Sequence, residues 1–365
     1  MAWRNRVEVS YASLRHNVAV VRERLGSRKL IAVVKADAYG LGLKRCARIY
    51  HEAGADMIAV AALSEADRLR SAVPAARILL LGSPLPEERS AIVASGYEVC
   101  CSTRDELQEF ASLATAQRPQ PVHLWVDTGM GRSGCSPAQV SELASLIRDT
   151  PTLLLRGLAS HYPDAINAAV SEPQEALMRA AITAAGPLDE GCWVHCANSE
   201  AVLARSDGPG SAARVGLLLT GVVPNGCEDP GLELAVRWLS SVSLVKELPA
   251  GHGISYTGAS VLQRDSVVAL VPVGYADGYP FGCSTRSQVL IEGRRCPLLG
   301  RVTMDYLVVD VTDCPRRPVP GEPVTLLGEQ GDDCIGVHEL AMWAGTIPYD
   351  ILCGLRGRCE IVGVP

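Results

Sequence analysis

The chain has 365 residues, which is enough for one large domain and a smaller one. With 34 basic and 40 acidic residues its net charge is −6, and no basic run is long enough to indicate nucleic-acid binding. No stretch is as long and apolar as a membrane span, so we expect neither a nucleic-acid-binding nor a membrane protein.

The thirteen cysteines are odd in number, lie among apolar neighbours and never show the CxxC spacing of metal sites. We interpret them as small buried side chains in a reducing compartment. The N-terminal residues are not followed by a signal-type apolar segment. We therefore expect a cytoplasmic enzyme without a metal site.

The first 230 residues alternate between short apolar runs and amphipathic segments. An alternating strand at 6–11 precedes a helix predicted over 12–25. Eight further strands are predicted, at 30–34, 57–63, 77–82, 97–101, 122–127, 153–160, 193–197 and 215–220. Helical patterns lie between most of them, for example at 43–53, 64–71, 104–114 and 137–148.

Eight parallel strands with intervening helices predict an α/β fold, a (β/α)8 TIM barrel over residues 12–230. A doubly wound open sheet is the alternative, but no GxGxxG motif follows the first strand.

Beyond residue 230 the pattern becomes β-rich, with turn residues between short strands. These strands are predicted at 237–248, 267–272, 288–291, 306–311 and 323–327, and a short helix follows near 338–344. We expect a mostly antiparallel β domain over residues 231–365, which the N-terminal strand within residues 1–11 joins.

The apolar run of residues 30–34 leads directly into Lys35 and a loop of small residues and glycines. Parallel sheets place active sites at the C-terminal ends of their strands, so Lys35 is a candidate for Schiff-base chemistry. Burial would lower the pKa of its amine. The alternative is a lysine that only extends its stem along the strand end.

The segment Val33-Val34-Lys35-Ala36-Asp37-Ala38-Tyr39-Gly40-Leu41-Gly42 resembles the cofactor-binding segment of the alanine racemase family. Further blocks resemble the same family along nearly the whole chain, at 126–134, 160–162, 195–199, 214–216, 253–256, 271–279, 300–305 and 349–354. The resemblance implies an isomerase that depends on pyridoxal 5'-phosphate and interconverts L- and D-enantiomers of alanine or a related small amino acid. It also implies a homodimer whose active sites are shared across the interface, with Tyr256 and Met304 reaching the partner's barrel.

The resemblance also implies a role for each matching residue. Lys35 and Tyr256 would be the two catalytic bases, one on each face of the substrate. The residues implied for the cofactor are Lys35, Tyr39, His161, Ser199, Arg214, Gly216 and Tyr349, and those implied for the substrate are Arg132, Met304, Asp305 and Tyr275. Ser199 is expected to cap a helix near the phosphate.

Arg214 is expected to face the pyridine nitrogen of the cofactor, with His195 behind it. A cationic arginine keeps this nitrogen unprotonated, whereas an aspartate would keep it protonated. The carbanion is then less delocalised, which favours prompt reprotonation over transamination.

Two residues depart from the family pattern. Trp125 stands where many members have a lysine that, as a carbamate, orients the motif arginine, and Thr220 stands where tyrosine is usual. Trp125 is expected either to stack on Arg132 or to face away as a core residue. Both changes leave the preferred amino acid open, so a larger or more polar substrate is an alternative to alanine.

Two other functions remain as alternatives. A barrel-type amino-acid decarboxylase shares the architecture, but its motifs match less well. A cofactor-carrier protein on the same barrel would lack the second domain and its tyrosine.

Overall fold

The computed structural model describes residues 4–205, 207–258, 260–355 and 357–365. The chain divides into two compact units. The barrel unit comprises Leu14–Ala38 and Leu43–Glu233, and the β unit comprises the rest of the described chain. No helix in these ranges is long and apolar enough to cross a membrane.

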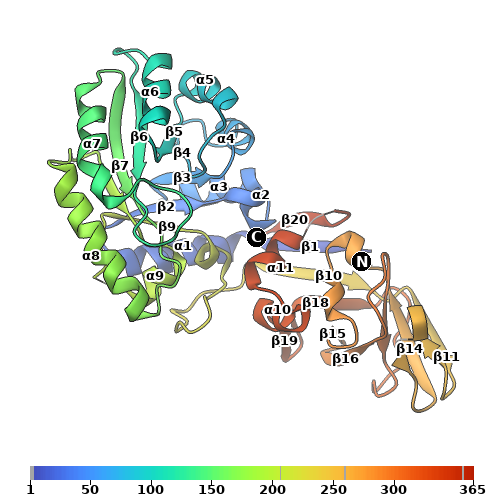
Figure 1. Ribbon diagram of the computed structural model, residues 1–365. Helices are drawn as coiled ribbons and strands as arrows, with labels where there is room; N and C mark the ends of the chain where they lie inside the picture. Colours follow the sequence, from blue (N-terminus) through green and yellow to red (C-terminus); the bar gives the residue numbers. More distant parts are fainter. Residues whose placement is uncertain (1–3, 206, 259, 356) are drawn as a thin grey trace. The chain divides into compact units, whose positions relative to one another are not determined.

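The barrel unit is a closed barrel of eight parallel strands (Figure 1). The strands are β2 (Lys29–Val33), β3 (Met57–Val60), β4 (Ile78–Leu80), β5 (Glu98–Cys101), β6 (Gln120–Trp125), β7 (Leu153–Ala159), β8 (Trp193–His195) and β9 (Ala212–Val215). Pairing of β9 with β2, with Leu30 opposite Ala213, closes the ring. The predicted (β/α)8 barrel is confirmed.

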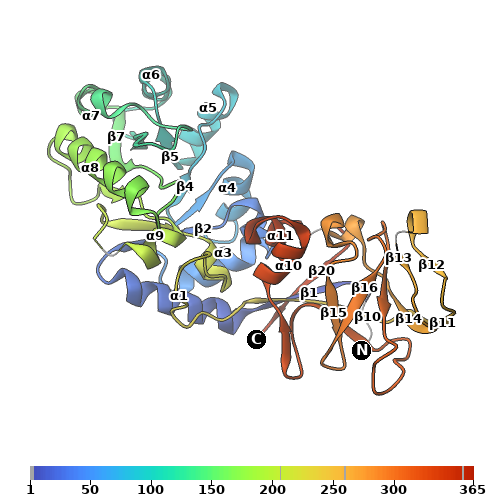
Figure 2. The ribbon, with the colours of Figure 1, turned by 60° about the horizontal axis from the view of Figure 1, so that its bottom comes forward.

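Burial explains why these strands are continuous apolar runs. Every residue of β3, β4 and β5 is buried, because inward side chains fill the barrel and outward ones lie under helices. Figure 2 shows α4 to α8 on the outside of the strands. The helices of the barrel region are α1 (Tyr11–Leu25), α2 (Lys35–Tyr39), α3 (Leu43–Glu52), α4 (Leu63–Arg70), α5 (Pro86–Ser95), α6 (Arg104–Leu113), α7 (Val140–Asp149, after a 3₁₀ turn at Pro137–Gln139), α8 (Ala168–Ala185) and α9 (Ser199–Ala204).

Helix α6 illustrates how the sequence begins a helix. The Glu106 N–H donates to the Thr103 hydroxyl at 3.2 Å, and the Glu106 carboxylate accepts the Thr103 N–H at 3.1 Å. This reciprocal capping box satisfies backbone donors that a helix start leaves unpaired. The buried Glu106 carboxylate therefore has a local structural role.

The strand predicted at 215–220 is wrong. The last barrel strand is β9 (Ala212–Val215), and Leu217–Thr220 forms a 3₁₀ turn, η2. Gly216, with φ −129° and ψ −64°, separates the two. All residues of the turn are buried, and a short apolar run that is buried on every side carries no periodicity to separate strand from turn.

The β unit is built on one mostly antiparallel sheet, in the order β11-β14-β17-β16-β15-β18-β10-β1-β20, with β19 paired to β18. Its strands are β1 (Arg6–Ser10), β10 (Val236–Ser241), β11 (Leu244–Leu248), β14 (Ser266–Val271), β15 (Gln288–Ile291), β16 (Arg294–Leu299), β17 (Leu307–Asp310), β18 (Pro323–Gln330), β19 (Asp333–Ile335) and β20 (Glu360–Val364). A separate ribbon pairs β12 (Gly253–Ile254) with β13 (Ser260–Val261). Strand β1 pairs antiparallel to β10 and parallel to β20.

The strand predicted over 237–248 is two strands. Strand β10 pairs with β18, whereas β11 pairs with β14, so the chain changes neighbours between them. The ribbon has a 3₁₀ turn of its own at Tyr256–Gly258. The described β unit contains four more short helical segments: η4 (Tyr275–Asp277), η5 (Phe281–Cys283), α10 (Val337–Ala344) and α11 (Pro348–Gly354). The short helix predicted near 338–344 corresponds to α10.

Candidate active site

Lys35 begins a left-handed turn at the C-terminal end of β2. Ala36, Asp37, Ala38 and Tyr39 all have φ between 53° and 57°, a region that costs a residue with a Cβ about 1–2 kcal/mol. Such strain persists only where the surroundings enforce it, and it is typical of functional sites. The sequence predicted only a loop here.

Carboxylates of the barrel unit hold this turn. The Ala36 N–H donates to Glu65 Oε1 at 2.6 Å, and the Leu43 N–H donates to Asp37 Oδ1 at 3.2 Å. Arg68 pairs with the same Asp37 oxygen at 2.8 Å. Lys35 itself is exposed, so the burial expected of its amine is not seen in the structure.

Three cationic side chains influence His161, which follows the C-terminal end of β7. Its pKa is lowered to about 3, first by burial and then by the positive charges of Arg214, Arg132 and Lys35. His161 is therefore neutral at pH 7. This end of the barrel brings together four of the residues predicted for cofactor and substrate, and its positive charge suits an anionic ligand.

The loop that carries Arg132 is organised by Asp127. Its Oδ1 accepts the N–H groups of Gly129, Met130 and Gly131 at 2.9–3.1 Å. Burial acts to raise the pKa of Asp127, but these three backbone donors lower it below its ordinary value. The loop geometry that presents Arg132 is thus set by an ionised aspartate, a residue that the motif contains but that we had not assigned a role.

Arg214, on β9, is buried and donates several hydrogen bonds. One terminal nitrogen donates to Nδ1 of His195 at 2.8 Å and also to the His195 carbonyl. The other donates to the Ser160 carbonyl at 2.6 Å and contacts Nδ1 of His161 at 3.1 Å. Within the described chain no hydrogen bond uses its Nε, so that donor remains for a ligand acceptor.

We had predicted that Ser199 caps the helix, and this prediction is wrong. Asn198 is the N-cap of α9, and its side chain accepts the Ala201 N–H at 2.9 Å. Asparagine and serine are equally good caps, so sequence could not decide between neighbours. The Ser199 hydroxyl instead accepts the N–H groups of Gly216 at 3.3 Å and Leu218 at 3.4 Å, which leaves its own proton to donate.

In the β unit, two predicted cofactor residues lie together. The rings of Tyr39 and Tyr349 are 6.0 Å apart, with Tyr39 buried and Tyr349 partly exposed. Burial raises the pKa of Tyr39, and the neighbouring Tyr349 raises it further, so its hydroxyl keeps its proton. Gly40 has φ +83°, and a Cβ there would lie 2.3 Å from the Leu352 carbonyl, so only glycine allows this segment to contact α11.

Tyr256 lies in the loop between β12 and β13 and is 69% exposed. The Ser255 hydroxyl beside it donates to the Arg301 carbonyl at 3.0 Å. A Cβ on Gly300, which has φ +69°, would lie 2.7 Å from Ser255 Cβ. The tyrosine loop therefore rests on the loop of residues 300–305.

Met304, Asp305 and Tyr275 belong to one cluster of loops. The Tyr275 N–H donates to the Thr303 carbonyl at 3.0 Å. Asp305 is paired with Arg358 at 2.7 Å, and Arg358 also makes a bidentate pair with the buried Asp277, at 2.9 Å for each bond. No motif of the sequence indicated a role for Arg358. Its ion pair shows that the Asp305 carboxylate is already engaged within the β unit.

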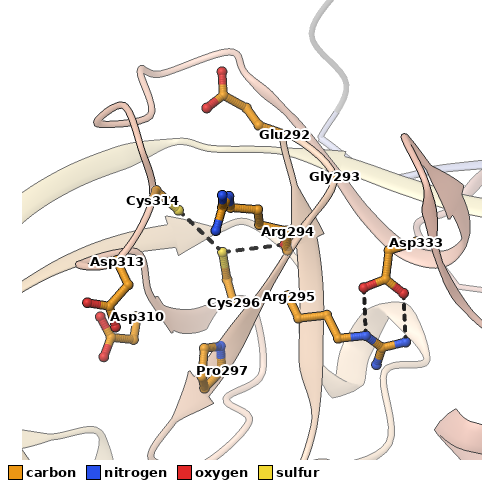
Figure 3. Close-up of a pocket in the computed structure, with 10 residues that line it drawn as sticks. All are labelled: Glu292, Gly293, Arg294, Arg295, Cys296, Pro297, Asp310, Asp313, Cys314 and Asp333. Atoms are coloured by element: carbon orange, nitrogen blue, oxygen red, sulfur yellow. Dashed lines mark hydrogen bonds and ion pairs between the residues drawn. The ribbon is translucent and has the colours of Figure 1, made fainter.

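A surface hollow lies away from these residues. It measures about 600 Å³ and is formed on the β15–β16 side of the β unit (Figure 3). It contains the thiols of Cys296 and Cys314, 3.6 Å apart, and an ion pair of Arg295 with Asp333 at 2.9 Å. None of the residues predicted for cofactor or substrate lines it.

Comparison with known proteins identifies the family. A sequence profile described as "Alanine racemase, N-terminal domain" matches residues 9–224, and one described as "Alanine racemase, C-terminal domain" matches residues 235–362. The chain belongs to the alanine racemase family.

Relatives match over nearly full length. The alanine racemase of Methylacidiphilum infernorum is 35% identical over 97% of this chain and 91% of its own, and that of Symbiobacterium thermophilum is 36% identical over 96% and 94%. The crystal structure of alanine racemase from D-cycloserine-producing Streptomyces lavendulae aligns with a TM-score of 0.93 at 32% identity, covering 100% of this chain and 98% of that one. The Bartonella henselae alanine racemase, crystallised with covalently bound pyridoxal phosphate, aligns with a TM-score of 0.90 at 26% identity and 99% coverage of both chains.

The two departures from the alanine racemase pattern are buried inside the barrel unit. The Arg214 guanidinium carbon lies 5.0 Å from the centre of the Trp125 ring, so the arginine over this indole is Arg214, whereas the two predicted alternatives were stacking on Arg132 and a core position facing away. The Thr220 hydroxyl donates to the Leu217 carbonyl of its own turn at 2.7 Å, and the residue is 1% exposed.

Proposed function

We propose that this protein is a pyridoxal-phosphate-dependent racemase that interconverts L- and D-alanine with two bases. The observation that carries the proposal is the convergence of Lys35, Arg132 and Arg214 on the neutral His161 at the C-terminal end of the barrel. Lys35 supplies the amine for the cofactor, Arg132 a guanidinium for the substrate carboxylate, and Arg214 a donor for the pyridine nitrogen.

The residues fit the cofactor. Lys35 offers the amine, the Ser199 hydroxyl retains a proton to donate, and Tyr39 with Tyr349 offers two phenolic donors for a phosphate. Nε of Arg214 is a free donor in the described structure, and a permanently cationic guanidinium can donate to a pyridine nitrogen but cannot protonate it. When bound, pyridoxal phosphate withdraws electrons from the substrate Cα and makes its proton acidic.

The chain's own residues then move the proton. Lys35 takes or returns it on one face and Tyr256 on the other, which allows both enantiomers to react. Arg132 binds the substrate carboxylate through its planar guanidinium and thereby orients the Cα hydrogen. His161 is neutral and so adds no charge next to the ring.

Alanine is the substrate that the departures favour. Trp125 and Thr220 were the positions at which a larger or more polar side chain could have gained space, but both are buried and engaged within the barrel unit. The naming of the relatives as alanine racemases supports the same choice.

We further infer a homodimer in which Tyr256 and Met304 complete the partner's site. Both side chains are more than half exposed in the single chain, which is consistent with a role outside their own unit. None of the thirteen cysteines, all of which lie in the described chain, forms a disulfide, and on that ground we infer a cytoplasmic location.

The test combines a substrate panel with covalent mapping. Enantiopure alanine, serine and larger amino acids are incubated with the cofactor-loaded protein, and loss of optical activity and CO₂ release are followed together. We expect inversion, fastest with alanine, without CO₂. Borohydride reduction should attach the cofactor to Lys35. Release of CO₂, or labelling of another lysine, would contradict the proposal.

A further inference from the structure

A chain of polar side chains runs through the barrel behind Arg214. Nε2 of His195 lies 2.7 Å from Nδ1 of His123, and Nε2 of His123 lies 2.9 Å from Oε2 of Glu98. Glu98 makes a bidentate ion pair with Arg77, at 2.6 and 2.8 Å. We refer to these five residues as the barrel relay.

The relay spans the barrel from one end to the other. Arg214 is near the C-terminal end of β9, whereas Glu98 is the first residue of β5 and Arg77 precedes β4. Both histidines are completely buried, and Glu98 is 6% exposed. Arg77 lies at the more open end, with its guanidinium 4.2 Å from the Trp193 ring centre.

The barrel is shaped to admit this chain. A Cβ on Gly157, in β7, would lie 2.2 Å from Nδ1 of His123, so the glycine makes room for the imidazole. The β6–β7 register also shifts between Val122 and His123. A barrel interior is normally filled by branched apolar side chains, so four buried polar groups in a row need a specific reason.

The groups at the two ends of this chain, the Arg214 guanidinium and the Glu98 carboxylate, determine which atom donates in each hydrogen bond between them. A guanidinium only donates, so Nδ1 of His195 must accept from Arg214. The His195 proton is then on Nε2 and is donated to Nδ1 of His123. The His123 proton is on Nε2 in turn and is donated to the Glu98 carboxylate. Each ring accepts at one nitrogen, so neither histidine can be doubly protonated.

The electrostatics agree with this assignment. Burial lowers the pKa of His123 and of His195, in spite of the Glu98 carboxylate beside His123. Burial alone would raise the pKa of Glu98, but the hydrogen bonds from His123 and Arg77 outweigh it and lower the value to about 2. At pH 7 the relay is a carboxylate, two neutral imidazoles and two guanidinium groups.

We propose that Glu98 is a positioning residue for Arg214: through His123 and His195 its carboxylate fixes the tautomers that hold the guanidinium in place. An acceptor at the far end keeps Nδ1 of His195 unprotonated, and only then can Arg214 donate to it. On the proposed function, which this role presupposes, Glu98 thereby fixes the donor that faces the pyridine nitrogen from across the barrel.

The first test reads the tautomers directly. Nitrogen-15 NMR of the histidine-labelled full-length protein, with assignments from His123→Gln and His195→Gln, reports which ring nitrogen carries the proton. We expect both residues to be neutral with the proton on Nε2 from pH 6 to 9. A proton on Nδ1 of either ring, or a charged ring in this range, would overturn the proposal. This result does not depend on racemase activity.

The second test removes the charge alone. A glutamine at position 98 can accept or donate, so Glu98→Gln leaves the direction of the chain undetermined. We expect its kcat for racemisation to fall about tenfold or more, with KM changed by less than about threefold. The ¹⁵N resonance of the labelled pyridine nitrogen should shift, and transamination per turnover should rise.

Glu106→Gln is the matched control. Glu106 is also a buried carboxylate of the barrel unit, but it belongs to the α6 capping box, where glutamine serves as well. It should leave kcat and the pyridine resonance unchanged. An unchanged kcat and resonance in Glu98→Gln would overturn the proposal.

Two further outcomes are decided separately. If Glu98→Gln does not fold, the histidine tautomers measured in the wild-type protein decide whether the proposal for Glu98 holds. If the wild-type protein neither binds pyridoxal phosphate nor racemises amino acids, the proposed function fails, whereas the tautomer result stands.

Discussion

Arg214 is a buried cation whose surroundings replace water almost completely. Desolvation of a guanidinium costs several kcal/mol, and hydrogen bonds to fixed acceptors offset that cost. Here those acceptors are Nδ1 of His195 and the Ser160 carbonyl, and the Trp125 ring covers the planar face. Burial lowers the pKa of Arg214 from its ordinary value, which shows how much this cation depends on its partners.

Trp125→Lys should therefore be harmful, although it introduces the lysine that the resemblance implies for many members of the family. A second cation would replace the ring that lies 5.0 Å from the guanidinium, at a position that is only 5% exposed. We expect a loss of about 3–5 kcal/mol in the free energy of unfolding, measured by urea denaturation. Trp125→Phe keeps an aromatic face and should lose less. Equal stability of Trp125→Lys and the wild type would show that the ring does not support Arg214.

Glu98 should make stability depend on pH. Its pKa in the folded state, about 2, lies below the ordinary 4.5, so the carboxylate stabilises the fold above pH 4.5. That contribution, roughly 3 kcal/mol, is lost as pH falls from 4.5 towards 2. Urea unfolding at pH 6, 5, 4 and 3 should show a steeper fall for the wild type than for Glu98→Gln. Parallel curves would mean that Glu98 has no depressed pKa.

At the scale of elements, one glutamate joins helix α4 to the turn of Lys35. The Glu65 carboxylate accepts the Ala61 and Ala62 N–H groups at 3.0 and 3.3 Å, and it also accepts the Ala36 N–H at 2.6 Å. A helix start and a strained turn thus share one side chain. Because the turn is left-handed at four consecutive residues, removing this contact should affect the position of Lys35.

We expect Glu65→Ala to lower the affinity for pyridoxal phosphate and to destabilise the protein by about 1–3 kcal/mol. Glu88→Ala is the control, because Glu88 accepts the Leu85 N–H at 2.9 Å in the equivalent box of α5 and makes no hydrogen bond to the Lys35 turn among the described residues. Cofactor titration by absorbance and urea unfolding separate the two effects. Equal losses of cofactor affinity in both variants would indicate a general effect of capping.

For the whole molecule, the proposed shared site predicts complementation between inactive subunits. Lys35→Ala and Tyr256→Phe should each abolish or strongly reduce racemisation alone. In a heterodimer both changes fall in one site, so the other site is wild type. Mixing equal amounts, with subunit exchange, should restore about a quarter of the wild-type activity, because about half of the dimers are mixed and each has one intact site.

The measurement is racemisation of L-alanine before and after mixing, with self-mixed samples of each variant as controls. Lys35 and Tyr256 acting within one chain would leave both sites of every heterodimer damaged. No recovery after verified subunit exchange would therefore contradict the shared site and leave the barrel assignments in place.

Local patterns of the sequence determined the barrel, the β-rich remainder and the Lys35 motif. Apolar runs such as 30–34 and helical patterns such as 43–53 are set by neighbouring residues, so they can be read without knowing the fold. Motif residues such as Arg132, His161 and Arg214 could be named because the resemblance carried them, and the structure brings them together with Lys35. Strand ends in fully buried runs, such as 215–220, could not be read from periodicity.

Only the tertiary structure decided which buried polar groups meet. Glu98 and His123 lie 25 residues apart, and nothing local shows that they face each other inside a closed ring of strands. The same holds for Trp125 under Arg214 and for Arg358 between Asp277 and Asp305. Strand order and stagger determine these partners, and they are properties of the closed barrel or sheet, so no single segment of the sequence contains them.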